Sequence, residues 1–214
     1  IPNSLTAEAV SKMGWDSVTI DMQHGLNDYS SSIGMLQAMS KSKSVPLVRV
    51  PWNEAGIIMK MLDLGVMGVI SPMINNKQEC EKFVSFCYYP PIGQRSFGPM
   101  RAQMIYGNNY YEKANDQIIS LAMIETKEAV ENIDEILSVP KLTGVYIGPA
   151  DMCSSYGLKP SFDNKIEPIF SNIKMIAKKA KEKGKIAGIH NGTTAYAKEM
   201  IDCGFNFVTV SSDF

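Results

Sequence analysis

The chain has no long apolar run and no excess of charge of either sign. No stretch is apolar over the roughly 20 residues that a helix needs to cross a bilayer. The 21 lysines and arginines nearly balance the 22 acidic residues. We therefore expect no membrane partner and no nucleic-acid partner, and we take a cytoplasmic location as the default. The densest basic group falls on one face of a predicted helix and comprises Lys174, Lys178, Lys179, Lys181, Lys183 and Lys185.

Cysteine is scarce, and its spacing excludes two common uses. Cys80, Cys87, Cys153 and Cys203 show neither the paired spacing of a zinc site nor the density of a small disulfide-stabilised secreted domain. We expect buried, reduced thiols. Cys153 follows Asp151 closely but has no base beside it in sequence, which disfavours a nucleophilic role.

What the chain does have is a regular alternation of short apolar runs and amphipathic segments. Residues 57–65 and 171–183 have helical periodicity, and each segment stops at a glycine. A first helix is expected at residues 4–13, so Ile1-Pro2 suggests the end of an additional, eighth strand before it. The other expected strands are 17–21, 46–50, 68–73, 120–125, 144–149, 186–190 and 207–212.

A repeating unit of strand and helix is typical of parallel α/β folds. Eight such units make a TIM (β/α)8 barrel, and 214 residues suit a single domain over residues 1–214. No helical segment follows the last expected strand, so we expect a barrel that lacks most of its first strand and its final helix. A doubly wound open sheet is the alternative, which spacing alone does not exclude.

Charged residues follow the ends of several expected strands. Asp21 and His24 follow the first run, Arg49 follows the second, and Glu125 and Asp151 follow two later ones. In parallel α/β folds, helices cover the sheet and leave the carboxyl ends of the strands for chemistry. We therefore expect one active site at this edge.

Glu125 and Asp151 are candidate metal ligands. A hard divalent cation needs oxygen ligands and commonly takes only one or two protein carboxylates. The alternative is that both acids only stabilise the starts of the following helices. Spacing does not decide between these interpretations.

The stretch 86–115 breaks the rhythm of strands and helices. It contains Tyr89-Pro90-Pro91-Ile92-Gly93-Gln94-Arg95, which is rich in residues that favour turns. We expect a long loop that either pads the barrel mouth or lets Arg95 reach an anionic substrate or a neighbouring subunit.

The chain contains five ordered motifs, which are Asp21-Met22-Gln23-His24, Arg49-Val50-Pro51-Trp52-Asn53, Tyr89-Pro90-Pro91-Ile92-Gly93-Gln94-Arg95-Ser96, Ile124-Glu125-Thr126-Lys127-Glu128-Ala129 and Ile147-Gly148-Pro149-Ala150-Asp151. Over essentially the whole chain, these motifs resemble those of the HpcH/HpaI aldolases. The resemblance implies a metal-dependent class II aldolase on a TIM barrel, related to the citrate lyase β subunit. Such an enzyme cleaves or forms 4-hydroxy-2-oxo acids, to or from pyruvate or hydroxypyruvate and an aldehyde.

The resemblance implies how the substrate is held. Glu125 and Asp151 would bind Mg²⁺, Mn²⁺ or Co²⁺, which the 2-oxo acid chelates. Within the run Gly148, Pro149, Ala150 and Asp151, the backbone amides around the last two residues would bind the substrate carboxylate.

It also implies the catalytic groups. Arg49 would bind the substrate and stabilise the enolate oxygen, where negative charge builds as the C–C bond breaks. His24 would take the proton of the aldol hydroxyl, directly or through a metal-bound water, with Asp63 as its paired acid. Asp21 would organise these groups.

Two positions depart from the family's pattern. Met123 stands where the best-known members carry glutamine, and Gln23 stands where many carry glutamate. Both would lie near the oxo acid, so the changes bear on substrate range. His190 is interpreted as lining of the rim or substrate pocket, and the resemblance implies a homo-oligomer, commonly a hexamer.

Two other functions stay open. A citrate-lyase-like or malyl-CoA-type lyase would use the same metal site on a CoA ester, although no basic cluster for CoA phosphates is evident near the motifs. A non-catalytic 2-oxo-acid-binding protein is less favoured, because every catalytic position is filled.

Overall fold

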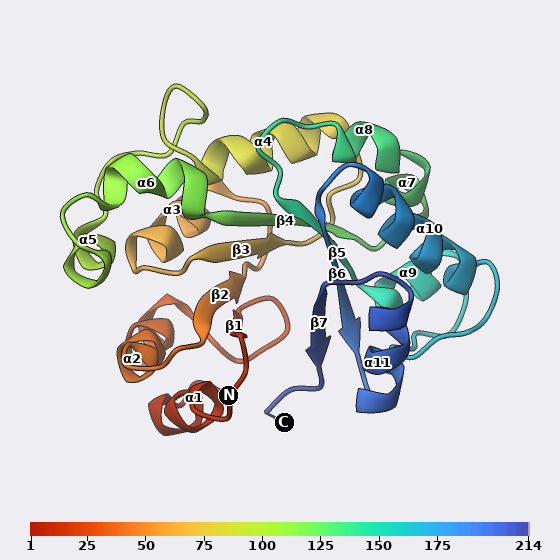
Figure 1. Ribbon diagram of the computed structural model, residues 1–214, viewed down its shortest axis with the longest axis horizontal. Helices are drawn as coiled ribbons and strands as arrows, with labels where there is room; N and C mark the ends of the chain where they lie inside the picture. Colours follow the sequence, from red (N-terminus) through yellow and green to blue (C-terminus); the bar gives the residue numbers. More distant parts are fainter. Residues whose placement is uncertain (214) are drawn as a thin grey trace. The chain divides into compact units, whose positions relative to one another are not determined.

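The computed structural model describes residues 1–213, and short strands alternate with helices along them (Figure 1). The chain divides into two compact units. The first comprises residues 1–71, 83–119 and 213, and the second comprises residues 72–82 and 120–212. No helix among the described residues is long and apolar enough to span a membrane.

Three parallel strands lie in the first unit. They are β1 (Ser17–Asp21), β2 (Val45–Arg49) and β3 (Gly68–Ser71), paired in sequence order. The register places Asp21 opposite Arg49. The helices of this unit are α1 (Ser4–Ser11), α2 (Tyr29–Met39), α3 (Ala55–Asp63), α5 (Met100–Tyr106) and α6 (Tyr110–Gln117), and α4 (Lys77–Cys87) runs from the second unit into the first.

Four parallel strands lie in the second unit. They are β4 (Ile119–Ile124, whose first residue belongs to the first unit), β5 (Gly144–Ile147), β6 (Ile186–Asn191) and β7 (Phe207–Val210). Ile124 pairs with Ile147, Ile147 pairs with Ile189, and Ile189 pairs with Val208. The helices are α7 (Lys127–Glu131), α8 (Ile133–Leu137), α9 (Pro149–Ser155), α10 (Ile169–Glu182) and α11 (Thr194–Asp202).

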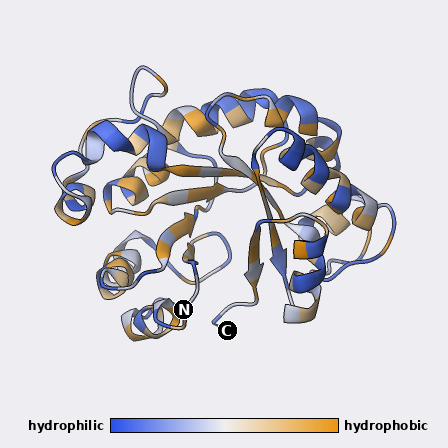
Figure 2. Cartoon of the chain, in the orientation of Figure 1, coloured by the Kyte–Doolittle hydropathy of each residue, from blue (hydrophilic) through white to orange (hydrophobic). Residues whose placement is uncertain are grey.

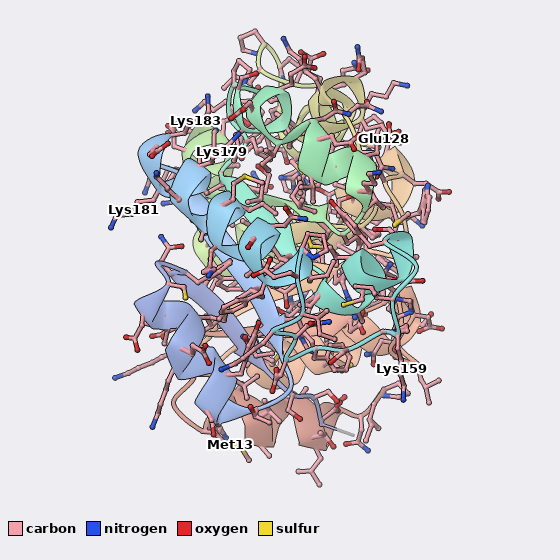
Figure 3. All side chains as sticks on the ribbon, turned by 90° about the vertical axis from the view of Figure 1, so that its right-hand side faces the viewer. Met13, Glu128, Lys159, Lys179, Lys181 and Lys183 are labelled. Carbon is pink, nitrogen blue, oxygen red and sulfur yellow. The ribbon has the colours of Figure 1, made fainter. Side chains whose placement is uncertain are left out.

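The helices are two-faced, as Figure 2 shows by their mixed colouring. In α10, Ile173 and Ile176 are fully buried against a sheet whose own residues are apolar. Lys181, on the opposite face, points away from the ribbon in Figure 3. Lys174, Lys178 and Lys181 are exposed on an amphipathic helix, as expected, whereas Lys185 lies after the end of α10 and donates to the backbone oxygens of Val139 and Leu142.

The seven strands expected within the chain are confirmed, with ends that differ by at most a few residues. Gly65 and Gly184 follow α3 and α10 with φ of 96° and 65°, a backbone conformation that glycine adopts without strain. Residues 1–3 form no strand. The long loop expected over 86–115 is wrong, because α5 and most of α6 lie there.

Candidate active site

Glu125 is a carboxylate held inside the second unit. It directly follows β4, and only 1% of its surface is exposed. Its Oε1 accepts a hydrogen bond of 2.7 Å from the backbone N–H of Met73. A buried acid costs free energy unless it is hydrogen-bonded or near a cation, so its placement at a strand end indicates a specific use.

The neighbouring strand brings a glycine against this carboxylate. Since Ile124 pairs with Ile147, Glu125 lies beside Gly148. A Cβ atom at Gly148 would lie 2.4 Å from Oε2 of Glu125, closer than real atoms approach. Asp151 follows in the first turn of α9 and is exposed. The structure thus places Glu125 and Asp151 after neighbouring strands, as the sequence predicted.

These groups fit a hard divalent cation. Carboxylate oxygens are the donors such cations prefer, and Gly148 leaves room beside Oε2 of Glu125. Residues 1–213 contain no cluster of three or more His, Cys, Asp or Glu side chains that could hold a metal. Glu125 and Asp151 are the two carboxylates that could hold such an ion, with its other positions left to water and substrate.

Asp21 organises a second group of candidates, in the first unit. Its carboxylate accepts two hydrogen bonds from Arg49, of 2.9 Å from Nε and 2.6 Å from Nη2. Its Oδ1 also accepts from the backbone N–H groups of Gln23 at 3.0 Å and His24 at 3.4 Å. Asp21, Gln23, His24 and Arg49 are therefore brought together, and the His24 side chain is exposed.

Burial alone would raise the pKa of Asp21, but Arg49 reverses the effect. The hydrogen bond and the charge of Arg49, with the amides of Gln23 and His24, hold the pKa of Asp21 below its ordinary value. The carboxylate stays ionised at neutral pH and keeps the guanidinium oriented.

Asp63 has a different partner from the one expected. Its Oδ1 accepts a hydrogen bond of 2.8 Å from Nη2 of Arg95, and among the described residues no hydrogen bond joins it to His24. The Arg95 side chain is 0% exposed and lies over the Tyr89 ring, 4.3 Å from its centroid. Its Nη1 donates to the Tyr110 hydroxyl. The expectation that Arg95 reaches a substrate is not met, because it is a buried ion-pair partner.

Three residues not singled out from the sequence lie around His190 in the second unit. Its Nδ1 is 3.1 Å from Oγ1 of Thr209 and 3.5 Å from the hydroxyl oxygen of Tyr146. The Phe162 ring packs edge-on at 4.9 Å between centroids. A polar tyrosine inside the apolar β5 run was the available signal, but only the side-chain positions show that its hydroxyl reaches His190.

Met123 lies on the same face of β4 as Glu125, with its Cε 3.1 Å from the position of a Cβ at Gly148. Its side chain is 1% exposed. It therefore packs beside the candidate metal carboxylate.

The cysteines take no part in these groups. All four are free, and Cys80, Cys87 and Cys153 are buried. Burial raises the pKa of Cys80 to about 12. The Cys153 sulfur accepts a hydrogen bond of 2.8 Å from Nδ2 of Asn164, which agrees with a packing role.

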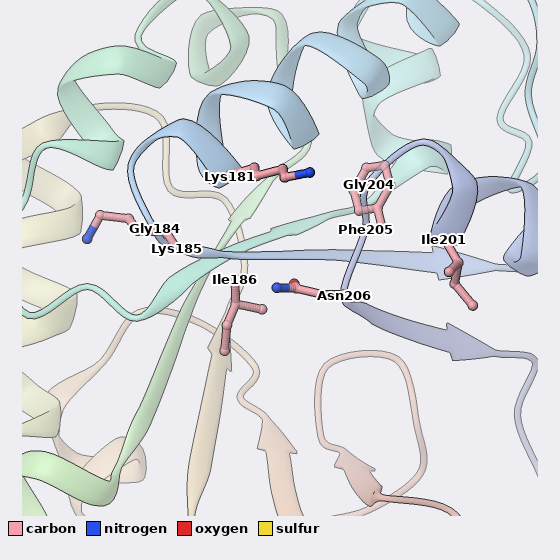
Figure 4. A pocket seen from close by; sticks show the side chains of 8 residues that line it. All are labelled: Lys181, Gly184, Lys185, Ile186, Ile201, Gly204, Phe205 and Asn206. Atoms are coloured by element: carbon pink, nitrogen blue, oxygen red, sulfur yellow. The ribbon is translucent and has the colours of Figure 1, made fainter.

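A surface hollow of the second unit lies elsewhere (Figure 4). It is found at the amino ends of β6 and β7, opposite to the ends that carry Glu125 and His190. Its lining residues are Lys181, Gly184, Lys185, Ile186, Ile201, Gly204, Phe205 and Asn206.

Comparison with known proteins gives matches over essentially the whole chain. Residues 2–214 match the model of the HpcH/HpaI aldolase/citrate lyase family. A hydroxypyruvate/pyruvate aldolase of Rhizorhabdus wittichii is 40% identical over 213 residues, covering 100% of this chain and 85% of that protein. A 5-keto-4-deoxy-D-glucarate aldolase of Escherichia coli O157:H7 is 32% identical over 216 residues, covering 100% of this chain and 83% of that protein.

A solved structure shows the same fold. An HpcH/HpaI aldolase/citrate lyase family protein from Burkholderia cenocepacia J2315 superposes with a TM-score of 0.93 at 27% identity, covering 100% of this chain and 85% of that one. The predicted α/β barrel class is thereby confirmed.

Proposed function

Because this chain belongs to the HpcH/HpaI aldolase/citrate lyase family, we propose that it is a divalent-metal-dependent aldolase acting on 4-hydroxy-2-oxo acids. The prediction of an enzyme of a lyase family is confirmed by the family and by the named relatives. The products would be pyruvate or hydroxypyruvate and an aldehyde. The reverse reaction would join the same compounds.

The observation that carries this proposal is the setting of Glu125. A buried carboxylate follows β4, a glycine directly after β5 leaves space beside it, and Asp151 follows that glycine in the first turn of α9. When bound there, Mg²⁺, Mn²⁺ or Co²⁺ would polarise the 2-oxo group and stabilise negative charge on its oxygen.

Other residues would position the substrate and move its proton. The first-turn amides of Ala150 and Asp151 have no acceptor within their helix and can bind the oxo acid carboxylate. Arg49, oriented by Asp21, would stabilise the enolate oxygen with a forked, permanently charged donor. The exposed imidazole of His24 would take the aldol hydroxyl proton and return it in the reverse direction.

The test is the release of pyruvate from a panel of 4-hydroxy-2-oxo acids, first with EDTA and then with Mg²⁺, Mn²⁺ or Co²⁺ restored. We expect release only with metal. Glu125→Gln should lose both turnover and Mn²⁺ binding measured by calorimetry. Glu128→Gln, an exposed acid in the next helix, is the matched control and should keep both. Unchanged release in EDTA would overturn the metal assignment.

A CoA-ester lyase is the second candidate, because the family includes citrate lyases. No pyruvate release from the panel of oxo acids, together with cleavage of malyl-CoA or citryl-CoA, would favour the CoA-ester lyase. Tight pyruvate binding without turnover would favour a non-catalytic binding protein. The homo-oligomeric assembly and the cytoplasmic location stay predictions, and gel filtration with light scattering tests the first.

A further inference from the structure

His190 shares a row with the candidate metal carboxylate in the second unit. His190 pairs directly with Thr209, and the register of β4, β5 and β6 places Glu125, Gly148 and His190 side by side at the same level. Paired residues of neighbouring strands point to the same face of a sheet. With strands about 4.8 Å apart, the backbones of Glu125 and His190 are roughly 10 Å from each other, a span that a small substrate can bridge.

The imidazole of His190 is held in a fixed orientation. The hydroxyls of Thr209 and Tyr146 lie 3.1 Å and 3.5 Å from Nδ1, and these two hydroxyl oxygens are 2.5 Å apart. The ring of Phe162 packs edge-on against it at 4.9 Å. Contacts on two sides keep the ring from rotating freely, while the side chain stays partly exposed.

The residues two positions earlier on the same face of these strands show that His190, Tyr146 and Thr209 are not simply core filling. There, Met123, Tyr146, Gly188 and Phe207 lie side by side, and the tyrosine ring packs over the glycine, with its Cδ2 2.8 Å from the position of a Cβ at Gly188. The Tyr146 hydroxyl reaches up to Thr209. Polar atoms of three strands thus gather at the level of Glu125, above an apolar layer.

We propose that His190 is a specificity-determining residue that hydrogen-bonds an oxygen of the bound substrate outside its 2-oxo acid group. This role rests on the proposed aldolase function. Nε2 is the ring nitrogen assigned to this bond, because Nδ1 contacts the two hydroxyls. The oxygen is a hydroxyl either on C3 of the oxo acid or on the aldehyde part, and the chemistry of recognition is the same.

The expected consequence is a preference for hydroxylated substrates. A site built to hydrogen-bond a hydroxyl leaves its own polar group unpaired when the analogue lacks one, which disfavours that analogue. His190→Phe keeps a ring and removes the bond, and should lower the preference by about tenfold. Thr209→Val, which releases the ring, should lower it less.

The experiment has two arms on Mn²⁺-loaded protein. Calorimetry compares the dissociation constants of hydroxypyruvate and pyruvate, and kinetics compares kcat/KM for glycolaldehyde and propanal, which have nearly equal size. The variants are His190→Phe, His190→Gln and Thr209→Val. Thr143→Val is the matched control, because Thr143 precedes β5 at the opposite end of the strands. His190→Gln, which keeps a donor, should restore part of the preference.

The outcomes separate the inference from the function on which it rests. A loss of preference in the first arm assigns the oxygen to C3, and a loss in the second assigns it to the aldehyde. Unchanged ratios in both arms, with wild-type turnover intact, would overturn the role of His190 and leave the aldolase standing. If the wild type binds neither oxo acid and shows no turnover, both proposals fail.

Discussion

Arg49 donates two parallel hydrogen bonds to the carboxylate of Asp21, of 2.9 Å and 2.6 Å. The same carboxylate accepts the backbone N–H groups of Gln23 and His24. One acid therefore fixes both the guanidinium at the end of β2 and the loop that carries the histidine.

Arg49→Lys keeps the positive charge but removes the fork that matches a carboxylate. Since the ammonium cannot bind Asp21 in two places, we expect kcat for aldol cleavage to fall by about 100-fold. Arg101→Lys is the matched control, because the hydrogen bond that Arg101 donates goes to a backbone oxygen, that of Leu64, and not to a carboxylate. A similar loss of kcat in both variants would show that the substitutions disturb the fold and not a catalytic interaction of Arg49.

The pair also predicts an acid-sensitive contribution to stability. Although burial opposes it, Arg49 lowers the pKa of Asp21, so the ionised form stabilises the folded state. This contribution is complete above the ordinary aspartate pKa of about 3.9 and is lost as pH falls through the lowered value. Urea unfolding should show wild type more stable than Asp21→Asn at neutral pH, with the gap closing in acid. A gap independent of pH would contradict it.

Gly148→Ala should disable the candidate metal site. The new Cβ would lie 2.4 Å from Oε2 and 3.1 Å from Cβ of Glu125, so the carboxylate must move. We expect Mn²⁺ affinity, measured by calorimetry, to fall at least about tenfold. In the control Gly56→Ala, the added methyl has no atom within 4 Å and should leave the affinity unchanged.

Asp63→Asn separates a structural role from a catalytic one. The substitution removes the negative partner of the fully buried Arg95, so we expect the free energy of unfolding to fall by about 3 kcal/mol. Asp202→Asn, at an exposed aspartate, should have little effect. Lost turnover at full stability would instead favour the pairing with His24 that the family resemblance implies.

The order of strands and helices was predictable from the sequence, because periodicity and stop residues act over a few neighbours. Apolar runs predict the positions of β1 to β7. Gly65 ends α3, the helix before β3, and Gly184 ends α10, the helix before β6. The positions of Glu125 and Asp151 after strands follow from the same local pattern. The hydrogen-bonding partners of the strand-end residues do not follow from this pattern, because several of them lie far away in the sequence.

Tertiary structure alone decided which side chains meet. Arg95 looked like a loop residue open to solvent, yet the chain folds back so that it pairs with Asp63 beneath Tyr89. The register between β5 and β6 pairs Tyr146 with Gly188, two residues before His190, so both side chains lie on one face and the Tyr146 hydroxyl lies 3.5 Å from Nδ1 of His190. A shift of one residue would turn either side chain to the opposite face, and register depends on packing over the whole sheet, which no local sequence window contains.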